Sequence, residues 1–206
     1  RDPYGQKMSK TKGNVVDPLE AIDESGADAL RFALIHGAAP GNDQKFSAEK
    51  LENARNFANK LWNAARFVML NLEHYTAAPV PDSQLAFEDQ WILSRLTTVT
   101  QQVTEALEQY QYSDAARTLY DFCWVEFCSS YIEMIKNRFQ DPARRAVAQR
   151  VAAHALDVIL RLLHPLIPFI TEEIWQLLGT IAPERGLAAP RPASRTNPRP
   201  GTRSSP

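Results

Sequence analysis

The sequence predicts a mainly α-helical protein: a charged loop and short helices, then an antiparallel helical bundle, then a disordered tail. Three observations lead to this fold class. Apolar residues between positions 51 and 162 recur at steps of three and four, the pattern of helices that pack along one another. Short connections join these helical stretches, which is typical of an antiparallel bundle. From about residue 182 large apolar side chains become rare, so no core is expected there.

The composition fits one sizeable globular domain. The 206 residues are 44% hydrophobic and carry a formal net charge of −1. A net charge near zero gives no overall basic field of the kind that many nucleic-acid binders have, which leaves room for a local basic patch only. No apolar run approaches the roughly 18 residues that a membrane span needs, so we expect no membrane partner.

The two cysteines, Cys123 and Cys128, are five residues apart on an expected α-helix. This spacing puts them on different faces, which favours neither a metal site nor a disulfide. The four histidines are scattered without the spacing of metal ligands. We therefore expect no bound metal and a reducing, cytoplasmic location.

A lysine-rich loop is the one stretch whose residue order suggests bond-making chemistry. Lys7, Lys10 and Lys12 lie within six residues, between Gly5 and Gly13. Ammonium groups on such a loop act as point charges on phosphate oxygens and can stabilise departing pyrophosphate. An arbitrary Lys-x-x-Lys loop is more often solvated surface, so the charge alone leaves both interpretations open.

The segment Lys7-Met8-Ser9-Lys10-Thr11 resembles the Lys-Met-Ser-Lys-Ser signature of class I aminoacyl-tRNA synthetases. The fourth-position lysine of that signature contacts ATP, and Lys10 holds that position here. Thr11 replaces the final serine but keeps a hydroxyl group. The resemblance implies that all five residues bind ATP, with Lys7 and Lys10 acting in catalysis. It also implies ATP with Mg2+ as a substrate and no permanently bound cofactor.

Two short helices are expected after the loop. Asp17, followed by a proline, supplies an N-cap, and Gly26 is a plausible stop. A second helix should then cover residues 27–36. Its Arg31 lies in a segment that resembles synthetases for branched aliphatic amino acids, where it could face the tRNA stem. The alternative is a local ion pair with a carboxylate such as Asp28.

Four long helices make up the expected bundle. Their approximate ranges are 47–74, 89–107, 113–138 and 141–162. Ser47 and Ser113 stand at N-cap positions of the first and third helices. A short last helix follows the prolines at 165 and 168 and ends near Gly179. The four tryptophans lie on amphipathic helices, so we assign them to packing.

The stretch from Asn56 to Phe67 resembles the opening helix of the anticodon-binding domain of valyl-tRNA synthetases. Residues 164–175 resemble the landmark that closes this bundle in the same family. Lys60 and Phe67 lie seven apart and hence on one helix face, so they are candidates for tRNA binding by charge and stacking. The alternative is that Phe67 belongs to the core and Lys60 is solvated.

The resemblance covers residues 1 to about 180. It implies that 1–46 end a class I catalytic domain, that 47–180 form the anticodon-binding bundle, and that 181–206 are a disordered tail. We expect the chain to be a fragment, and removal of residues 183–206 to leave thermal unfolding unchanged. The valine pocket and the N-terminal catalytic and editing domains would lie elsewhere in the same protein.

For the whole enzyme the resemblance implies ATP-dependent activation of valine to valyl-adenylate and transfer of the valyl group to valine-specific tRNA. ATP, valine and tRNA are then the partners, and this segment by itself is expected to be inactive. An isoleucyl- or leucyl-tRNA synthetase shares the loop and the bundle and stays an alternative. A stand-alone tRNA-binding helical module and an inert helical scaffold are alternatives of other classes.

Overall fold

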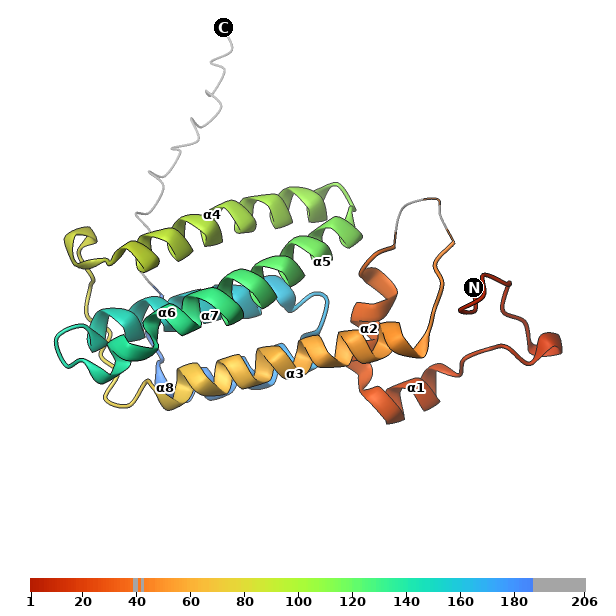
Figure 1. Cartoon of the computed structure of the whole chain (residues 1–206), viewed down its shortest axis with the longest axis horizontal. Helices are drawn as coiled ribbons and strands as arrows, with labels where there is room; N and C mark the ends of the chain where they lie inside the picture. Colours follow the sequence, from red (N-terminus) through yellow and green to blue (C-terminus); the bar gives the residue numbers. More distant parts are fainter. Residues whose placement is uncertain (39–40, 42, 187–206) are drawn as a thin grey trace, which may run out of the picture.

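A computed structural model of the chain describes residues 1–38, 41 and 43–186. Within these residues all regular secondary structure is helical, which confirms the predicted class (Figure 1). The α-helices are α1 (Pro18–Ser25), α2 (Ala27–Ile35), α3 (Ala48–Leu70), α4 (Phe87–Glu108), α5 (Tyr112–Asp121), α6 (Ile132–Ile135), α7 (Arg145–Leu163) and α8 (Pro168–Ile181). A π-helix (Phe122–Tyr131) joins α5 to α6, and 3-10 turns cover Lys10–Lys12, Asp82–Gln84 and Lys136–Gln140.

The first helices begin where the sequence predicts. The Asp17 carboxylate accepts a hydrogen bond from the N–H of Leu19 at 2.8 Å, and the Ser47 hydroxyl accepts one from Lys50 at 3.2 Å. Both side chains satisfy a donor that the first turn of a helix leaves free. Gly26 separates α1 from α2 with a φ of 89°, a conformation that glycine adopts without strain.

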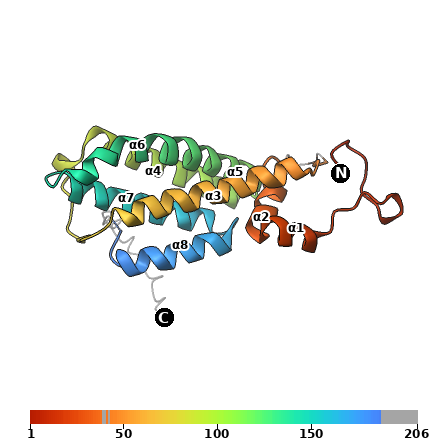
Figure 2. The same ribbon diagram turned by 60° about the horizontal axis from the view of Figure 1, so that its bottom comes forward.

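The bundle is built from α3, α4, the α5–α6 segment and α7, with α8 packed against α7 and α3 (Figures 1 and 2). Its core holds fully buried side chains from different helices, among them Leu61, Ile92, Phe127 and Leu156. Helix α2 packs on α3 and also reaches α5 and α8, while the N-terminal loop projects beyond α1 (Figure 1). None of the described helices has an apolar stretch long enough to cross a membrane.

The third long helix differs from the single α-helix expected over 113–138. Helix α5 begins at Tyr112, so Ser113 is not its cap, and the chain winds as a π-helix over residues 122–131. A π-helix closes each hydrogen bond to the fifth residue back instead of the fourth. The hydroxyls of Ser129 and Ser130 follow this longer turn, because each donates to the carbonyl five residues earlier, at 2.8 and 2.9 Å.

The π-helix also corrects the expectation for the cysteines. An α-helix has 3.6 residues per turn, so residues five apart diverge, whereas the π-helical turn brings them one above the other. Cys123 and Cys128 are both buried. The two cysteines therefore share a face of this helix.

The packed part of the chain continues past the expected start of the tail. Helix α8 runs to Ile181, Ala182 is fully buried, and Arg185 is 6% exposed. The Arg185 guanidinium donates to the Asp157 carboxylate at 2.7 Å and lies over the Trp175 ring at 4.8 Å. The packed region thus reaches residue 186, and the rest of the expected tail, 187–206, lies outside the described residues.

Candidate functional site

The lysine-rich loop is held by a buried aspartate and an asparagine. The Asp2 carboxylate accepts hydrogen bonds from the backbone N–H groups of Tyr4 and Gln6 at 3.1 and 2.7 Å, and from the Asn14 amide at 3.0 Å. The amide oxygen of Asn14 in turn accepts from the N–H of Ser9 at 2.9 Å. The bond from Asn14 is the largest cause that lowers the pKa of Asp2. Sequence reasoning missed both residues, because a lone aspartate and a lone asparagine carry no motif.

The three lysines of the loop point into solvent. Lys7, Lys10 and Lys12 are exposed, and none of them forms an ion pair with any residue that the structure describes. Residues 10–12 form a 3-10 turn that Gly13 ends by donating its N–H to the carbonyl of Lys10 at 3.2 Å. The φ of Gly13 is 66°, in the left-handed region that favours glycine. The loop therefore presents free ammonium groups on a defined turn.

The other three residues of the signature anchor the loop. Met8 is half-buried and lines a cavity of about 240 Å³ together with Leu30 and Phe46. The hydroxyls of Ser9 and Thr11 are hydrogen-bonded to each other at 2.8 Å. Thr11 thus uses its hydroxyl group inside the loop, so the methyl group that distinguishes it from serine does not prevent this contact.

Helix α2 connects the loop region to the bundle through two charged side chains. The Arg31 guanidinium donates to the carbonyls of Leu166 and Pro165, both at 3.1 Å. Asp28 caps α8, since its carboxylate accepts from the N–H groups of Phe169 and Ile170 at 3.3 and 2.7 Å. Arg31 pairs with the turn between α7 and α8 instead of with Asp28. Both side chains therefore fix the angle between α2 and the bundle.

Lys60 and Phe67, the candidates on α3, are each paired with a different neighbour. The Lys60 ammonium lies 5.5 Å from the centre of the Trp124 ring. Phe67 is half-buried and stands edge-on to Phe139 at 6.0 Å, with the Lys136 ammonium 5.8 Å from its ring centre. Lys60 and Phe67 thus belong to two separate pairs of a cation and an aromatic ring, instead of forming one clamp together.

A second set of charges lies inside the bundle. The Arg138 guanidinium donates to both carboxylate oxygens of Asp89, at 2.8 and 2.7 Å, and to Glu88 at 3.0 Å. The Tyr131 hydroxyl donates to Asp89 at 3.1 Å, and burial is the largest cause that raises the pKa of Tyr131. Asp89 also accepts from the backbone N–H of Ala86 at 3.1 Å. These groups have little capacity left for a ligand, so this cluster is structural.

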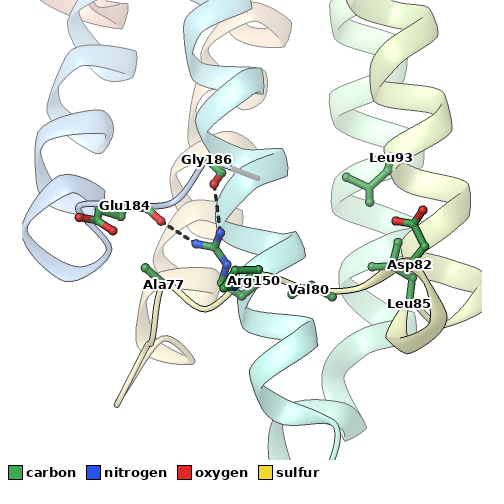
Figure 3. Close-up of a pocket in the computed structure, with 9 residues that line it drawn as sticks. Ala77, Val80, Asp82, Leu85, Leu93, Arg150, Glu184 and Gly186 are labelled. Atoms are coloured by element: carbon green, nitrogen blue, oxygen red, sulfur yellow. Dashed lines mark hydrogen bonds between the residues drawn. The ribbon is translucent and has the colours of Figure 1, made fainter. Parts of the chain in front are cut away.

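A cavity of about 380 Å³ between the 77–85 connection and residues 184–186 is lined by Arg150 (Figure 3). The Arg150 guanidinium donates to the carbonyls of Glu184 and Gly186, at 2.6 and 3.0 Å, and to the Tyr75 hydroxyl. These bonds fasten the C-terminal segment to the bundle. With both terminal nitrogens engaged in this way, Arg150 holds the segment in place, and the exposed loop is the better candidate for binding a polyanion.

Two families match the sequence, one on each side of the junction between loop and bundle. Residues 1–47 match the class I tRNA synthetases for isoleucine, leucine, methionine and valine, and residues 89–197 match the anticodon-binding domain of tRNA ligase. A valine–tRNA ligase of Dehalococcoides mccartyi is 52% identical over 200 residues, and one of Symbiobacterium thermophilum is 52% identical over 187 residues. These alignments cover 94% and 89% of the chain.

The chain belongs to the valyl-tRNA synthetase family. It spans about a fifth of the length of these relatives, 22% and 20% of the two sequences. The isoleucyl and leucyl alternatives are not better supported than the valyl family.

Solved synthetases share the fold of this valyl-family chain. A methionyl-tRNA synthetase of Mycobacterium tuberculosis in complex with methionyl-adenylate superposes with a TM-score of 0.73 at 23% identity, covering 86% of this chain and 36% of that one. The LeuRS–tRNA–LeuAMS ternary complex of Agrobacterium radiobacter K84 gives a TM-score of 0.70 at 24% identity, covering 87% and 22%. At these identities the likeness concerns the fold alone.

Proposed function

We propose that this chain supplies the ATP-contacting loop and the tRNA-binding bundle of an enzyme that activates valine with ATP and transfers it to valine-specific tRNA. The observation that carries the proposal is a set of three exposed lysines that pair with no carboxylate among the described residues, on a loop held by Asp2 and Asn14. Close relatives named valine–tRNA ligase support the choice of substrate.

The chemistry of the proposed first step explains why a lysine loop is useful. The valine carboxylate attacks the α-phosphate of ATP, which enters as its Mg2+ complex, and pyrophosphate leaves. Negative charge grows on the pyrophosphate as the bond breaks. A nearby ammonium group therefore stabilises the transition state more than it stabilises bound ATP. Lys7 and Lys10 are assigned this role, while Met8, Ser9 and Thr11 shape the loop around the nucleotide.

Replacing Lys10 by alanine in a complete enzyme that contains this segment tests the assignment. We expect turnover in valine-dependent ATP/pyrophosphate exchange to fall. The fall should correspond to a loss of about 2 to 4 kcal/mol of transition-state stabilisation, as for removal of one preorganised donor. The Michaelis constant for valine should change much less. Circular dichroism should show the same helix content and the same unfolding midpoint as the unmodified enzyme.

Lys12 provides the matched control, because it stands two residues away on the same 3-10 turn and is equally free of ion pairs in the described chain. Lys12→Ala should reduce turnover far less than Lys10→Ala. Equal losses would mean that the loop acts as a diffuse positive patch, and the roles given to Lys7 and Lys10 would be wrong.

For tRNA, we propose contacts along the bundle surface at the two cation and aromatic pairs. A lysine beside a ring can contact a phosphate while the ring stacks on an unpaired base. Lys60 has no carboxylate partner among the described residues, whereas the Lys136 ammonium is held by both oxygens of Glu133 at 2.6 Å. Lys60 is therefore the better phosphate contact, and Trp124 joins Phe67 as a candidate stacking residue.

Titration of valine-specific tRNA against the complete enzyme at several salt concentrations separates the possibilities. Lys60→Gln should weaken binding and lower the slope of log affinity against log salt by about 0.7, the value for one single-strand phosphate contact. Lys136→Gln is the matched control and should have the smaller effect, since Glu133 already holds that ammonium. An unchanged slope for Lys60→Gln would remove it from the interface. The same titration of the 206-residue chain distinguishes a stand-alone RNA-binding module, which would bind selectively, from a scaffold, which would not bind.

A further inference from the structure

Asn14 lies between a hydrogen-bond donor and a hydrogen-bond acceptor, which fixes the direction of its side-chain amide. Its oxygen accepts from the backbone N–H of Ser9 at 2.9 Å, and its nitrogen donates to the Asp2 carboxylate at 3.0 Å. The nitrogen also makes a longer bond, of 3.5 Å, to the carbonyl of Lys7. An aspartate here would offer two acceptors and a leucine neither group. Among side chains of this length, asparagine is therefore the one that pairs with both neighbours.

Asp2 is the fixed end of this arrangement. It is 6% exposed, and one of its carboxylate oxygens accepts from two backbone N–H groups. The adjacent carbonyl of Arg1 accepts from the N–H of Phe46 at 3.0 Å, and the Phe46 side chain packs against the core. The bond between Asn14 and Asp2 thus connects the loop to a part of the chain that is anchored on the rest of the molecule.

The bonds of Asn14 are placed where they can set the positions of the signature lysines. They hold the backbone on both sides of the second signature residue, at the carbonyl of Lys7 and the N–H of Ser9. The 3-10 turn that carries Lys10 starts directly after Ser9, and the N–H of Lys12 donates back to the Ser9 carbonyl at 3.1 Å. A displacement of Ser9 would therefore move Lys10 as well.

We propose that Asn14 is a positioning residue, which joins the backbone at Lys7 and Ser9 to Asp2 and so places the ammonium groups of Lys7 and Lys10 for the departing pyrophosphate. This inference rests on the proposed function of the loop. Asn14 acts through the lysines and touches no phosphate itself. Because a charged group stabilises a transition state best from a preformed position, a loop without this bond would lose turnover although all its lysines remain.

The first test measures the hydrogen bond itself, in the 206-residue chain without ATP or tRNA. The Ser9 N–H donates to Asn14, so its hydrogen exchange, followed by NMR, reports on this bond. In Asn14→Ala we expect Ser9 to exchange about three- to tenfold faster. Asp17→Ala is the matched control, because it removes a side-chain acceptor from the N–H of Leu19, just outside the loop. Unchanged exchange in Asn14→Ala, or equally fast exchange in the control, would overturn the proposal.

A reciprocal swap of the two side chains tests whether their pairing sets the rate. Asn14→Asp alone places two carboxylates in contact, and Asp2→Asn alone places two amides in contact whose donors and acceptors no longer match. Each should lower turnover in valine-dependent ATP/pyrophosphate exchange by the complete enzyme on the order of tenfold, with a smaller change in the Michaelis constant for valine. In the double variant the amide at position 2 donates to the carboxylate at position 14, so most of the turnover should return.

A background without the signature lysines separates this inference from the proposed function. When Lys7 and Lys10 are both alanine, Asn14→Ala should change turnover by less than about twofold, because residues that act as a unit are not additive. A full further loss in that background would overturn the positioning role, as would a swap that restores nothing. The inference fails alone if Lys10→Ala loses turnover while Asn14→Ala, with fast exchange at Ser9, does not. Both it and the proposed function fail if Lys10→Ala keeps its turnover.

Discussion

The charged residues of the N-terminal loop and those inside the bundle have opposite surroundings. Lys7, Lys10 and Lys12 are exposed and have no ion pair in the described chain, whereas Asp89 and Arg138 are 0% and 3% exposed and bind each other through two hydrogen bonds. A solvated ammonium can meet a phosphate at low desolvation cost. A buried, doubly bonded carboxylate has no such freedom. Charged side chains are therefore free to meet a ligand in the loop, whereas in the bundle they are engaged in holding the structure together.

This difference predicts that activity and stability should separate by region. An exposed charge contributes little to stability, typically less than about 1 kcal/mol, because water solvates it in both the folded and the unfolded chain. Removing one partner of a buried pair leaves an uncompensated charge in the interior, at a cost of about 3 to 5 kcal/mol. Substitutions in the loop should thus change activity, and substitutions in the buried pair should change folding.

The largest effect is expected for Asp89→Ala. It leaves the Arg138 guanidinium buried without its main partner and removes the acceptor of the Tyr131 hydroxyl. The free energy of unfolding, measured by urea denaturation of the 206-residue chain, should fall by about 3 to 5 kcal/mol. Lys10→Ala in the same chain should leave it unchanged. A comparable loss for Lys10→Ala would break the contrast between the two regions.

Glu126→Ala sharpens this test, because it breaks a pair of the same geometry at the surface. Arg95 donates to both Glu126 oxygens at 2.7 and 2.8 Å, but the two side chains are 38% and 22% exposed. We expect a loss under about 1 kcal/mol. If Glu126→Ala cost as much as Asp89→Ala, burial would not be the property that matters.

The second effect concerns the end of the described chain. Truncation after residue 182 removes Arg185 from Asp157 and removes the carbonyls of Glu184 and Gly186 from Arg150, whereas truncation after 186 keeps all of these contacts. We expect the shorter chain to be less stable than the longer one by about 2 kcal/mol, the scale of a hydrogen bond to a charged group. Thermal unfolding of the two chains measures the difference. Identical midpoints would support the original expectation that nothing beyond residue 182 contributes.

The helical fold could be predicted because its signals are local or periodic. The spacing of apolar residues predicts the bundle. The N-cap side chains of Asp17 and Ser47 locate the first residues of α1 and α3 without error. The loop stood out because Lys7 to Thr11 is a motif as well as a cluster of charge. Whether those residues bind ATP stays a prediction.

The parts that sequence reasoning missed depend on contacts between distant residues. Arg31 donates to the carbonyls of Pro165 and Leu166, which are 134 and 135 residues away in the sequence. No local sequence pattern predicts such a partner. The buried Asp89–Arg138 pair likewise joins α4 to the turn after α6. The π-helix was missed because an apolar rhythm with steps of three and four is read as α-helix, and the longer turn changes only a few positions.

The smallest expected effect is a pH dependence of stability caused by His36. It tests whether the junction between the loop and the bundle is solvated like the loop or buried like the bundle. His36 lies at the end of α2, between loop and bundle, where its ring stacks on Phe32 at 5.2 Å and approaches Tyr120 at 5.1 Å. Burial is the largest cause that lowers the pKa of His36, and the charge of Lys50 adds to it. The unfolded chain, with a histidine pKa of about 6.5, then binds the proton more readily than the folded chain.

The sign of the pH effect follows from this difference. The neutral ring contributes its full stability above about pH 6.5, and that contribution falls as the pH drops through and below this value. The free energy of unfolding should therefore decrease between pH 7 and pH 5. His36→Gln should make this decrease smaller by under about 1 kcal/mol, because water screens a half-buried ring. His74→Gln, at an exposed histidine, is the matched control. If His36→Gln left the pH dependence unchanged, the junction would behave like the solvated loop. Charged groups would then be shielded from water only within the bundle.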